Sequence, residues 1–385
     1  MKIPRSGPAV AMSALALVLS ACGSNETSNI EETTAGSQSE EHSEHSDHEH
    51  SDGSDFSSLS GTLNGSGASS QGKAMQAWKD GFGAVSDVKV NYTETGSGTG
   101  REQFIGGEVS FIGTDAALKP EEMAAATERC GGAGVVETPT YVSPIAVAFN
   151  LPGIEHVNMS AENIAEVFNG KITMWNDPKL VENNPDIELP DMAIITVNRA
   201  DKSGTTENFT DYLAQVVPDV WGFEAAQEWP VMDGVLGQSA EGTSGVVSLV
   251  QNTEGGITYA DASQIGELGS VAVKIGDEFI PYSAEAAAKI VDGSPAAADA
   301  SDTVLTVDLQ RDGSIEGAYP IVLISYHVAC LEYDDEAEAA NVAGLLTYIA
   351  SVDGQNAAAD HAGIAPISED MRERVNSAIA KISAK

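Results

Sequence analysis

The chain has 385 residues, and its 58 Asp and Glu against 19 Lys and Arg give a formal net charge of −39. So negative a protein repels nucleic-acid phosphates and anionic lipid headgroups, which argues against both as partners. The part beyond the N-terminal segments described next is long enough to bury two hydrophobic cores, so we expect two domains.

The N-terminus has the pattern of an export signal. Lys2 and Arg5 precede a mostly apolar run, residues 9–19, that is too short to span a bilayer permanently. The run leads into Leu-Ser-Ala-Cys, which ends at Cys22 and resembles a bacterial lipobox, in which the cysteine carries lipid. We therefore expect residues 1–21 to be a lipoprotein signal peptide; the alternative is an ordinary signal peptide with a chance cysteine.

Residues 22–58 are acidic and rich in Ser and His, with almost no large apolar side chains. Such a composition cannot offset the entropy of ordering, so we expect a disordered tether behind the lipid. Four spaced imidazoles within it are of a type that binds Zn²⁺ or Cu²⁺, namely His42, His45, His48 and His50. A solvated polar spacer is the interpretation that we favour over a metal site.

Apolar, β-rich runs alternate with helical patterns along the rest of the chain. The strands that we expect are Val85–Tyr92, Val109–Gly113, Val135–Asn150, Ala193–Val197, Ile257–Tyr259 and Ile321–Val328. Helical spacing recurs around Trp78, Val167 and Tyr212, and over 343–350 and 371–382. This alternation predicts an α/β architecture with mainly parallel sheets. Besides Cys22 the chain has Cys130 and Cys330, which suggest one disulfide or, alternatively, two buried thiols.

Four segments rich in Gly, Ser and Thr each stand just before a helical pattern. They are Leu63–Ser70, Thr95–Gly100, Lys202–Thr206 and Glu241–Gly245. Helix N-termini carry unpaired N–H groups and partial positive charge, and glycine lets the backbone approach a ligand. One such segment is ordinary helix capping. Four in one chain predict a cradle for an anion.

Charged residues beside these segments sharpen the prediction. Arg199 follows a strand and offers planar, bidentate donors suited to a tetrahedral oxyanion. Asp201 stands next to it, either to orient the guanidinium or to accept a proton from the ligand; the alternative is a surface ion pair. Asp115 ends a short strand, at the edge where open α/β sheets bind ligands. It is either a helix cap or an acceptor for a protonated ligand.

The segments GSGASS, YTETGSGTGREQF, FIGTDAAL, NRADKSGTTENFTDYL and AYPIVLISY resemble, in this order, the phosphate-binding proteins of bacterial ABC-type phosphate importers. The resemblance extends from about residue 59 to the C-terminus. It implies a two-domain periplasmic-binding-protein fold of type II, hinged by two crossing strands, with the ligand cleft between the domains. Domain I would comprise 59–147 and 322–385, and domain II 148–321.

By the same resemblance the phosphate ligands are Ser69, Ser70, Ser97, Asp115, Arg199, Asp201, Ser203, Gly204 and Thr205. The sequence departs from the family at Ser70, where an aromatic residue is common, at Gln71, where proline is common, and at Arg101. Arg101 either adds charge near the mouth of the cleft or faces solvent.

The resemblance implies a monomeric, non-enzymatic receptor without a cofactor, lipid-anchored outside the cell membrane, that delivers inorganic phosphate to the permease and ATPase of an ABC importer. Screening damps distant acidic charge over about 8–10 Å, so the net charge does not forbid an anionic ligand. Three alternatives stay open: a phosphatase-like hydrolase, a metal-binding lipoprotein using the tether, and a receptor for sulfate or molybdate.

Overall fold

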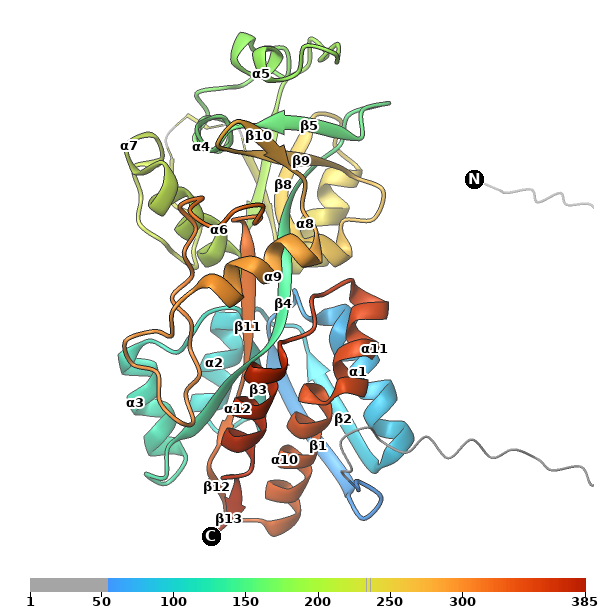
Figure 1. Ribbon diagram of the computed structural model, residues 1–385, viewed down its shortest axis with the longest axis vertical. Coiled ribbons are helices and arrows are strands. Elements are labelled where there is room, and N and C mark those ends of the chain that lie inside the picture. The colour runs from blue at the N-terminus through green and yellow to red at the C-terminus, as the bar shows by residue number, and fades with distance from the viewer. Residues whose placement is uncertain (1–54, 233, 236) are drawn as a thin grey trace, which may run out of the picture. The chain divides into compact units, whose positions relative to one another are not determined.

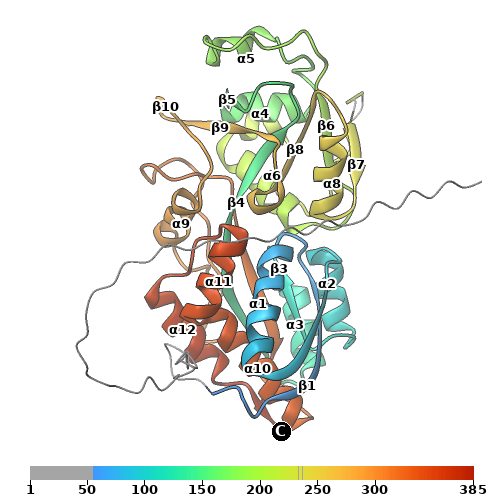
Figure 2. The same cartoon turned by 90° about the vertical axis from the view of Figure 1, so that its right-hand side faces the viewer.

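The computed structural model describes residues 55–385 apart from 233 and 236, all within one compact unit. Its largest sheet has eleven strands, with the central order β2-β1-β3-β11-β4-β8-β6-β7 (Figures 1 and 2). Helices alternate with strands through the described residues, which confirms the predicted α/β class. The signal peptide, Cys22 and the four tether histidines lie outside the described residues.

The first lobe is the group of elements around β1 (Ser60–Gly67), β2 (Asp87–Thr93) and β3 (Phe111–Thr114), which pair in parallel. Its helices are α1 (Gly72–Val85), α2 (Ser97–Ile105), α3 (Pro120–Arg129), α10 (Glu336–Ala350), α11 (Val352–Ala362) and α12 (Glu369–Ile379). The short strands β12 (Glu332–Tyr333) and β13 (Ser383–Ala384) pair with each other. Trp78, Phe82 and Phe111 are fully buried in its core.

The second lobe is the group around β6 (Ile195–Arg199), β7 (Gly237–Ala240) and β8 (Gly256–Asp261). It adds the strands β5 (His156–Met159), β9 (Gly269–Ile275) and β10 (Glu278–Ile280). Its helices are α4 (Ala161–Phe168), α5 (Pro178–Asn183), α6 (Gly204–Val216), α7 (Pro218–Trp221), α8 (Gly242–Gln251) and the 3-10 turn η1 (Ala262–Gln264). Helix α9 (Ala284–Gly293) packs on the strands that join the lobes.

Two long strands connect the lobes, β4 (Val135–Phe149) and β11 (Val322–Cys330), and every residue of both is buried. They run antiparallel to each other, with Val322 opposite Pro144 and Cys330 opposite Val135. Beyond Pro144, β4 pairs instead with β8. The sheet is therefore mixed: the pairs made by β4 and β11 are antiparallel, whereas the pairs β1–β3 and β6–β8 are parallel. The prediction of mainly parallel sheets was wrong, because the two connecting strands run in opposite directions through the middle of the sheet.

The prediction that Leu63–Ser70 is a Gly-rich turn before a helix is wrong in part, because Leu63–Gly67 forms the end of β1. Its glycines are required by packing between neighbouring strands. A Cβ on Gly65 would lie 2.4 Å from the Phe111 ring, and one on Gly67, whose φ is +128°, would lie 2.0 Å from the carbonyl oxygen of Gly113. Glycine at these two positions allows β1 to lie closely beside β3. The high glycine content of this segment therefore does not indicate a loop.

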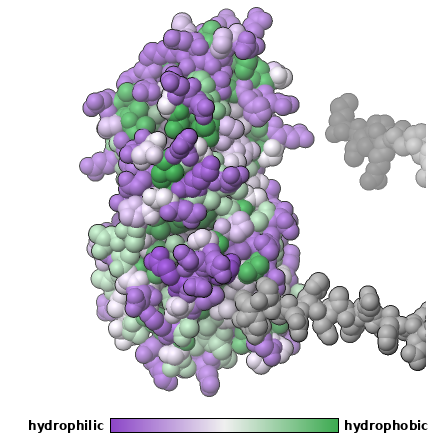
Figure 3. All heavy atoms as spheres, in the orientation of Figure 1, coloured by the Kyte–Doolittle hydropathy of each residue, from purple (hydrophilic) through white to green (hydrophobic). Residues whose placement is uncertain are grey.

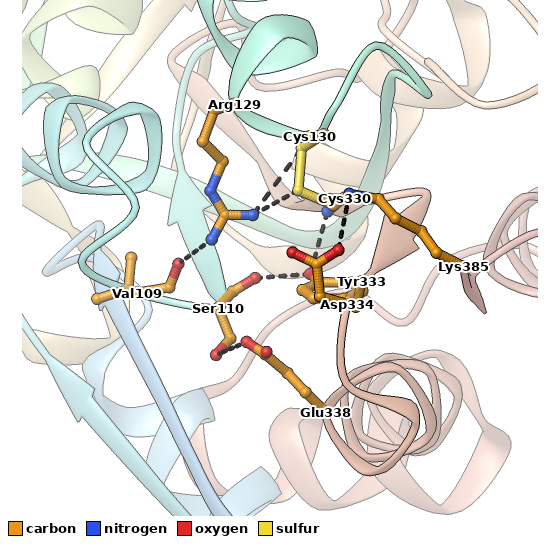
Figure 4. Close-up of a disulfide and its surroundings, with 9 residues drawn as sticks. All are labelled: Val109, Ser110, Arg129, Cys130, Cys330, Tyr333, Asp334, Glu338 and Lys385. Atoms are coloured by element: carbon orange, nitrogen blue, oxygen red, sulfur yellow. Dashed lines mark hydrogen bonds and ion pairs between the residues drawn. A yellow bond between two sulfur atoms is a disulfide. The ribbon is translucent and has the colours of Figure 1, made fainter.

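Cys130, directly after α3, and Cys330, at the end of β11, form a disulfide (Figure 4). The Arg129 guanidinium lies beside it, donates to Cys330 Sγ and, over 3.0 Å, to the carbonyl oxygen of Val109. Tyr333 donates its hydroxyl to the carbonyl oxygen of Ser110 over 2.7 Å. The bond joins residues 200 positions apart within the first lobe.

The face drawn in Figure 3 is mostly hydrophilic, with small separate apolar areas. In the described part of the chain, no helix combines the length and apolar character that crossing a membrane requires.

Candidate functional site: helix N-termini from both lobes around Asp115 and Arg199

Four helices begin where the two lobes meet: α1 and α2 from the first lobe, α6 and α8 from the second. Ser69, just before α1, bonds the Thr243 hydroxyl of α8 over 3.0 Å and accepts the Thr243 N–H over 3.1 Å. On the other side, Gly98 of α2 donates its N–H to the Lys202 carbonyl oxygen over 3.1 Å. The four predicted segments thus converge, and their partial positive charges add at one place.

Asp115 lies in the first lobe directly after β3 and is 2 % exposed. Its Oδ1 accepts from the hydroxyls of Ser70 over 2.7 Å and Ser325 over 2.8 Å. Its Oδ2 accepts from Thr205 of α6 over 3.0 Å, a contact between the lobes. Burial raises the pKa of the Asp115 carboxyl, against the lowering effect of these hydroxyls and of the Arg199 charge.

The backbone of Asp115 is held as firmly as its side chain. Its N–H donates to Ser97 Oγ over 3.1 Å, and its carbonyl oxygen accepts from Asn208 Nδ2 over 2.6 Å. Gly204 is required at the start of α6, because a Cβ there would lie 2.6 Å from the Asp115 Cβ and 2.8 Å from Ser97 Oγ. Ser70, Ser97, Asp115, Gly204 and Thr205 therefore form one contact group, as their motifs suggested.

Arg199 ends β6 and is 3 % exposed, although it is charged. Its guanidinium binds Asp201 in a bidentate manner, with Nε donating to Oδ1 over 2.7 Å and Nη2 donating to Oδ2. The N–H of Gly242, at the start of α8, also donates to Asp201 Oδ1, over 3.1 Å. Burial opposes ionisation of Asp201, but the bonds and charge of Arg199 outweigh it and lower the pKa of this carboxyl.

An aromatic cluster within the second lobe supports the Arg199 loop, which is the segment from Arg199 at the end of β6 to the start of α6 at Gly204. Tyr259 stacks on Phe209 with ring centroids 4.5 Å apart, and Trp229 and Phe168 pack around them. The Tyr259 hydroxyl accepts the Arg199 N–H over 3.2 Å and bonds Thr206 Oγ1 over 2.8 Å. Burial raises the pKa of Tyr259 to about 12, so it stays a neutral hydroxyl at this point.

The two carboxylates of the site, Asp201 and Asp115, differ in their hydrogen-bond partners. Asp201 is neutralised by Arg199 and orients it, whereas the partners of the Asp115 carboxylate among the described residues are three hydroxyl groups, which can donate or accept. Ser203 Oγ accepts the N–H of Thr206 over 3.2 Å and so caps α6. An arrangement of this kind can stabilise an anion through a guanidinium, helix N-termini and hydroxyl groups, and a buried carboxylate can accept a hydrogen bond from an anion that carries a proton.

The sequence reasoning missed two hydroxyls, those of Thr243 and Ser325. Thr243 lay in a recognised Gly/Ser/Thr segment but was not singled out, and Ser325 lies in an apolar strand, where one serine draws no attention. The interpretation that Arg101 faces solvent was wrong: it is fully buried in the first lobe, where Nε donates to Glu122 Oε1 over 3.0 Å and Nη1 donates to Thr114 Oγ1.

No group of three or more His, Cys, Asp or Glu side chains in the described part of the chain is arranged to hold a metal ion. His156, His327 and His361 lie on separate elements, β5, β11 and α11.

The fold and this site are those of a two-lobed solute-binding protein, and the model of the PBP superfamily domain matches residues 32–353. Over 389 residues the chain is 32 % identical to Phosphate-binding protein PstS 3 of Mycobacterium tuberculosis, covering all of both chains. It is 30 % identical over 391 residues to Phosphate-binding protein PstS2 of Mycobacterium bovis, again over all of both. The chain belongs to the PBP superfamily and, within it, to the family of phosphate-binding proteins.

Solved structures agree with this fold. A phosphate-binding protein from Stenotrophomonas maltophilia matches with a TM-score of 0.68 at 22 % identity, over 84 % of this chain and 96 % of that one. A high-affinity periplasmic phosphate-binding protein solved with phosphate (PfluDING) matches with a TM-score of 0.66 at 19 % identity, over 82 % and 93 %.

Proposed function

We propose that this chain is an extracytoplasmic receptor that binds inorganic phosphate between its lobes and presents it to the permease of an ABC importer. The observation that carries the proposal is the buried Asp115, which shares hydroxyl donors from both lobes and lies within the field of Arg199. Phosphate near neutral pH needs both positive donors and an acceptor for its proton, and this site combines them. The relatives named as phosphate-binding proteins support the same ligand.

The proposed phosphate ligands are those named from the sequence: Ser69, Ser70, Ser97, Asp115, Arg199, Asp201, Ser203, Gly204 and Thr205. On this proposal the protein does no chemistry on phosphate and acts as a monomer. Residues 59–147 with 322–385 would form one domain and 148–321 the other. They would close about β4 and β11, since β4 exchanges β11 for β8 as its partner after Pro144.

One calorimetric titration tests the ligand. Purified protein is titrated with phosphate, arsenate, sulfate and molybdate at one pH and ionic strength. We expect binding of phosphate and arsenate, with little heat from sulfate or molybdate. Tight sulfate or molybdate binding without phosphate binding would reassign the receptor to another oxyanion. Zinc-stimulated hydrolysis of phosphomonoesters would instead favour the hydrolase.

Attachment to the membrane through Cys22 is the second part of the proposal, and it rests on the sequence pattern alone. Cys22→Ser should move the protein from the membrane fraction to the soluble fraction and leave phosphate affinity unchanged. A wild-type protein recovered wholly in the soluble fraction contradicts lipid anchoring.

A further inference from the structure

The side-chain amide of Gln264 reaches from the second lobe to the segment that leads into α1. It donates to the carbonyl oxygens of Ser69 over 2.8 Å and Ser70 over 2.9 Å. Gln264 is the last residue of η1, directly after β8, and lies 195 positions from Ser69. Its amide is thus placed against the phosphate-facing segment, on the side of the carbonyl groups.

The surrounding contacts bring η1 to the same segment from two more directions. Tyr141 of β4 donates its hydroxyl to Asp261 Oδ2 over 2.8 Å and also lies 3.3 Å from the Ser70 carbonyl oxygen. Lys73, in the first turn of α1, donates to the carbonyl oxygen of Ser263. Both strengthen a junction whose central element is the Gln264 amide, because this one group bonds two successive carbonyl oxygens.

The planar trans peptide turns this contact into a constraint on the binding site. The C=O and N–H of one peptide unit point in opposite directions, so holding Ser69 O sets the direction of the Ser70 N–H. Holding Ser70 O sets the Gln71 N–H in the same way. Among hydrogen bonds between described residues, neither N–H is a donor. These donors at the start of α1 are the kind that bind anions.

We propose that Gln264 is a positioning residue for phosphate, which fixes the Ser69–Ser70 and Ser70–Gln71 peptides so that their N–H groups face the anion. The inference rests on the proposed function and assigns a role to a residue outside the contact group around Asp115. Without the amide, the Ser69 carbonyl oxygen keeps the longer bond from the Gly72 N–H, over 3.3 Å, and the Ser70 carbonyl oxygen keeps the Tyr141 hydroxyl, also over 3.3 Å. Both peptides are then held less firmly and rotate more freely. Phosphate binding must then also orient these N–H groups, which costs free energy and lowers the affinity.

The test uses Gln264→Glu, which keeps the shape of the side chain but puts acceptors where the donor was. At about pH 8 the ionised carboxylate repels both carbonyl oxygens, and we expect the phosphate Kd to rise about 10–100-fold over wild type. Toward about pH 5 the facing carbonyl groups favour protonation of Glu, which restores one donor. The ratio of variant to wild-type Kd should therefore shrink as the pH falls.

Taking the ratio at each pH removes the titration of phosphate itself. It also removes any effect of pH on the ionisable groups packed around this segment, which include Lys73, Glu94, Asp115, Tyr141 and Asp261. Gln76→Glu is the matched control, since it adds the same charge to the exposed face of α1, where the Gln76 side chain bonds Asp80, one turn further along the same helix. Gln264→Ala removes the donor without charge, and should raise Kd less and at every pH alike. Thermal melts of all three variants verify folding.

A Gln264→Glu ratio that equals that of Gln76→Glu, or that does not change between the two pH values, overturns the inference and makes Gln264 an ordinary contact between the lobes. In that outcome wild-type affinity for phosphate is intact, so the proposed function survives. A wild-type protein that fails to bind phosphate overturns both.

Discussion

β11 connects two regions of the first lobe that are held together by different means. Near its middle, Ser325 is one of three hydroxyl donors to Asp115, in a group whose bonds also cross to the second lobe. At its end, Cys330 is bonded covalently to Cys130 beside the charge of Arg129 (Figure 4). Hydrogen bonds can be exchanged for a ligand, whereas the disulfide cannot. Ligand affinity and stability should therefore respond to different mutations, although one strand carries both.

The largest expected effect on the ligand site is that of Arg199→Ala. It removes a buried charge and leaves Asp201 without its bidentate partner, so phosphate affinity should fall by about 2–5 kcal/mol, measured by calorimetry. Lys202→Ala is the control, because its ion pair with Glu102 is exposed on both sides and should matter by less than about 1 kcal/mol. A loss for Arg199→Ala below about tenfold would make this arginine peripheral.

Cys330→Ser, at the C-terminal end of β11, should have the opposite effect to Arg199→Ala: it should lower stability and leave phosphate affinity unchanged. Opening a link between residues 200 positions apart should lower the free energy of unfolding by about 2–5 kcal/mol, measured by denaturant titration. Phosphate affinity should stay within about twofold of wild type, since Ser325 and Asp115 keep their hydrogen bonds. Cys130→Ser should match it in both measurements. A large loss of affinity would show that the two regions are coupled through β11.

Between these regions lies His327, two residues after Ser325 and fully buried against Trp78 and Phe111. Burial lowers the pKa of its imidazole to about 3, so the folded protein holds it neutral while the unfolded chain protonates it below about pH 6.5. Stability from this residue is thus complete above pH 6.5 and is lost as the pH falls, by about 2 kcal/mol at pH 5.

The measurement is the pH dependence of unfolding for wild type and His327→Asn. Asp261 and Glu137 contribute in the opposite direction, because burial raises their pKa values to about 6 and about 7 and the folded state gains from their protonation. The difference between the two curves isolates the histidine. Parallel curves from pH 7 to pH 5 would mean that His327 titrates in the folded protein.

The sequence predicted what depends on local pattern and missed what depends on distant partners. Glycine and hydroxyl residues before a helix located the loop from Arg199 to Thr205, because a helix N-terminus acts through its own first turn. The end of a short strand located Asp115 in the same local way. Arg101 and Gln264 find their partners through folding: Arg101 is neutralised by Glu122, and Gln264 meets carbonyl groups 195 and 194 positions away. Neither position carries a signal in its own neighbourhood. Gly65 misled the sequence prediction for a related reason: glycine is required there because the Phe111 ring of the adjacent strand β3 occupies the space of a side chain.

The prediction with the smallest expected change in binding energy concerns Asp115 and the selectivity for phosphate over sulfate. Phosphate near neutral pH carries at least one proton and sulfate carries none. If Asp115 binds the ligand as proposed, its buried carboxylate should accept a hydrogen bond from protonated phosphate but repel sulfate, whose oxygens would face it as unpaired acceptors. Asp201 does not supply this discrimination, because Arg199 and Gly242 already occupy its oxygens.

Asp115→Asn keeps the shape of the side chain and replaces the charge by an amide, which can donate to sulfate. The phosphate-to-sulfate affinity ratio should therefore fall at least about tenfold, or 1.4 kcal/mol, when both anions are titrated at one pH and ionic strength. The hydroxyls of Ser70, Ser325 and Thr205 can rotate to accept from the amide, so the fold should tolerate the change. Ser325→Ala is the control: it removes one donor to Asp115 but keeps the charge, and should weaken phosphate binding without admitting sulfate. An unchanged ratio in Asp115→Asn would mean that Asp115 only shapes the turn after β3, and that selectivity arises from the donors around Arg199.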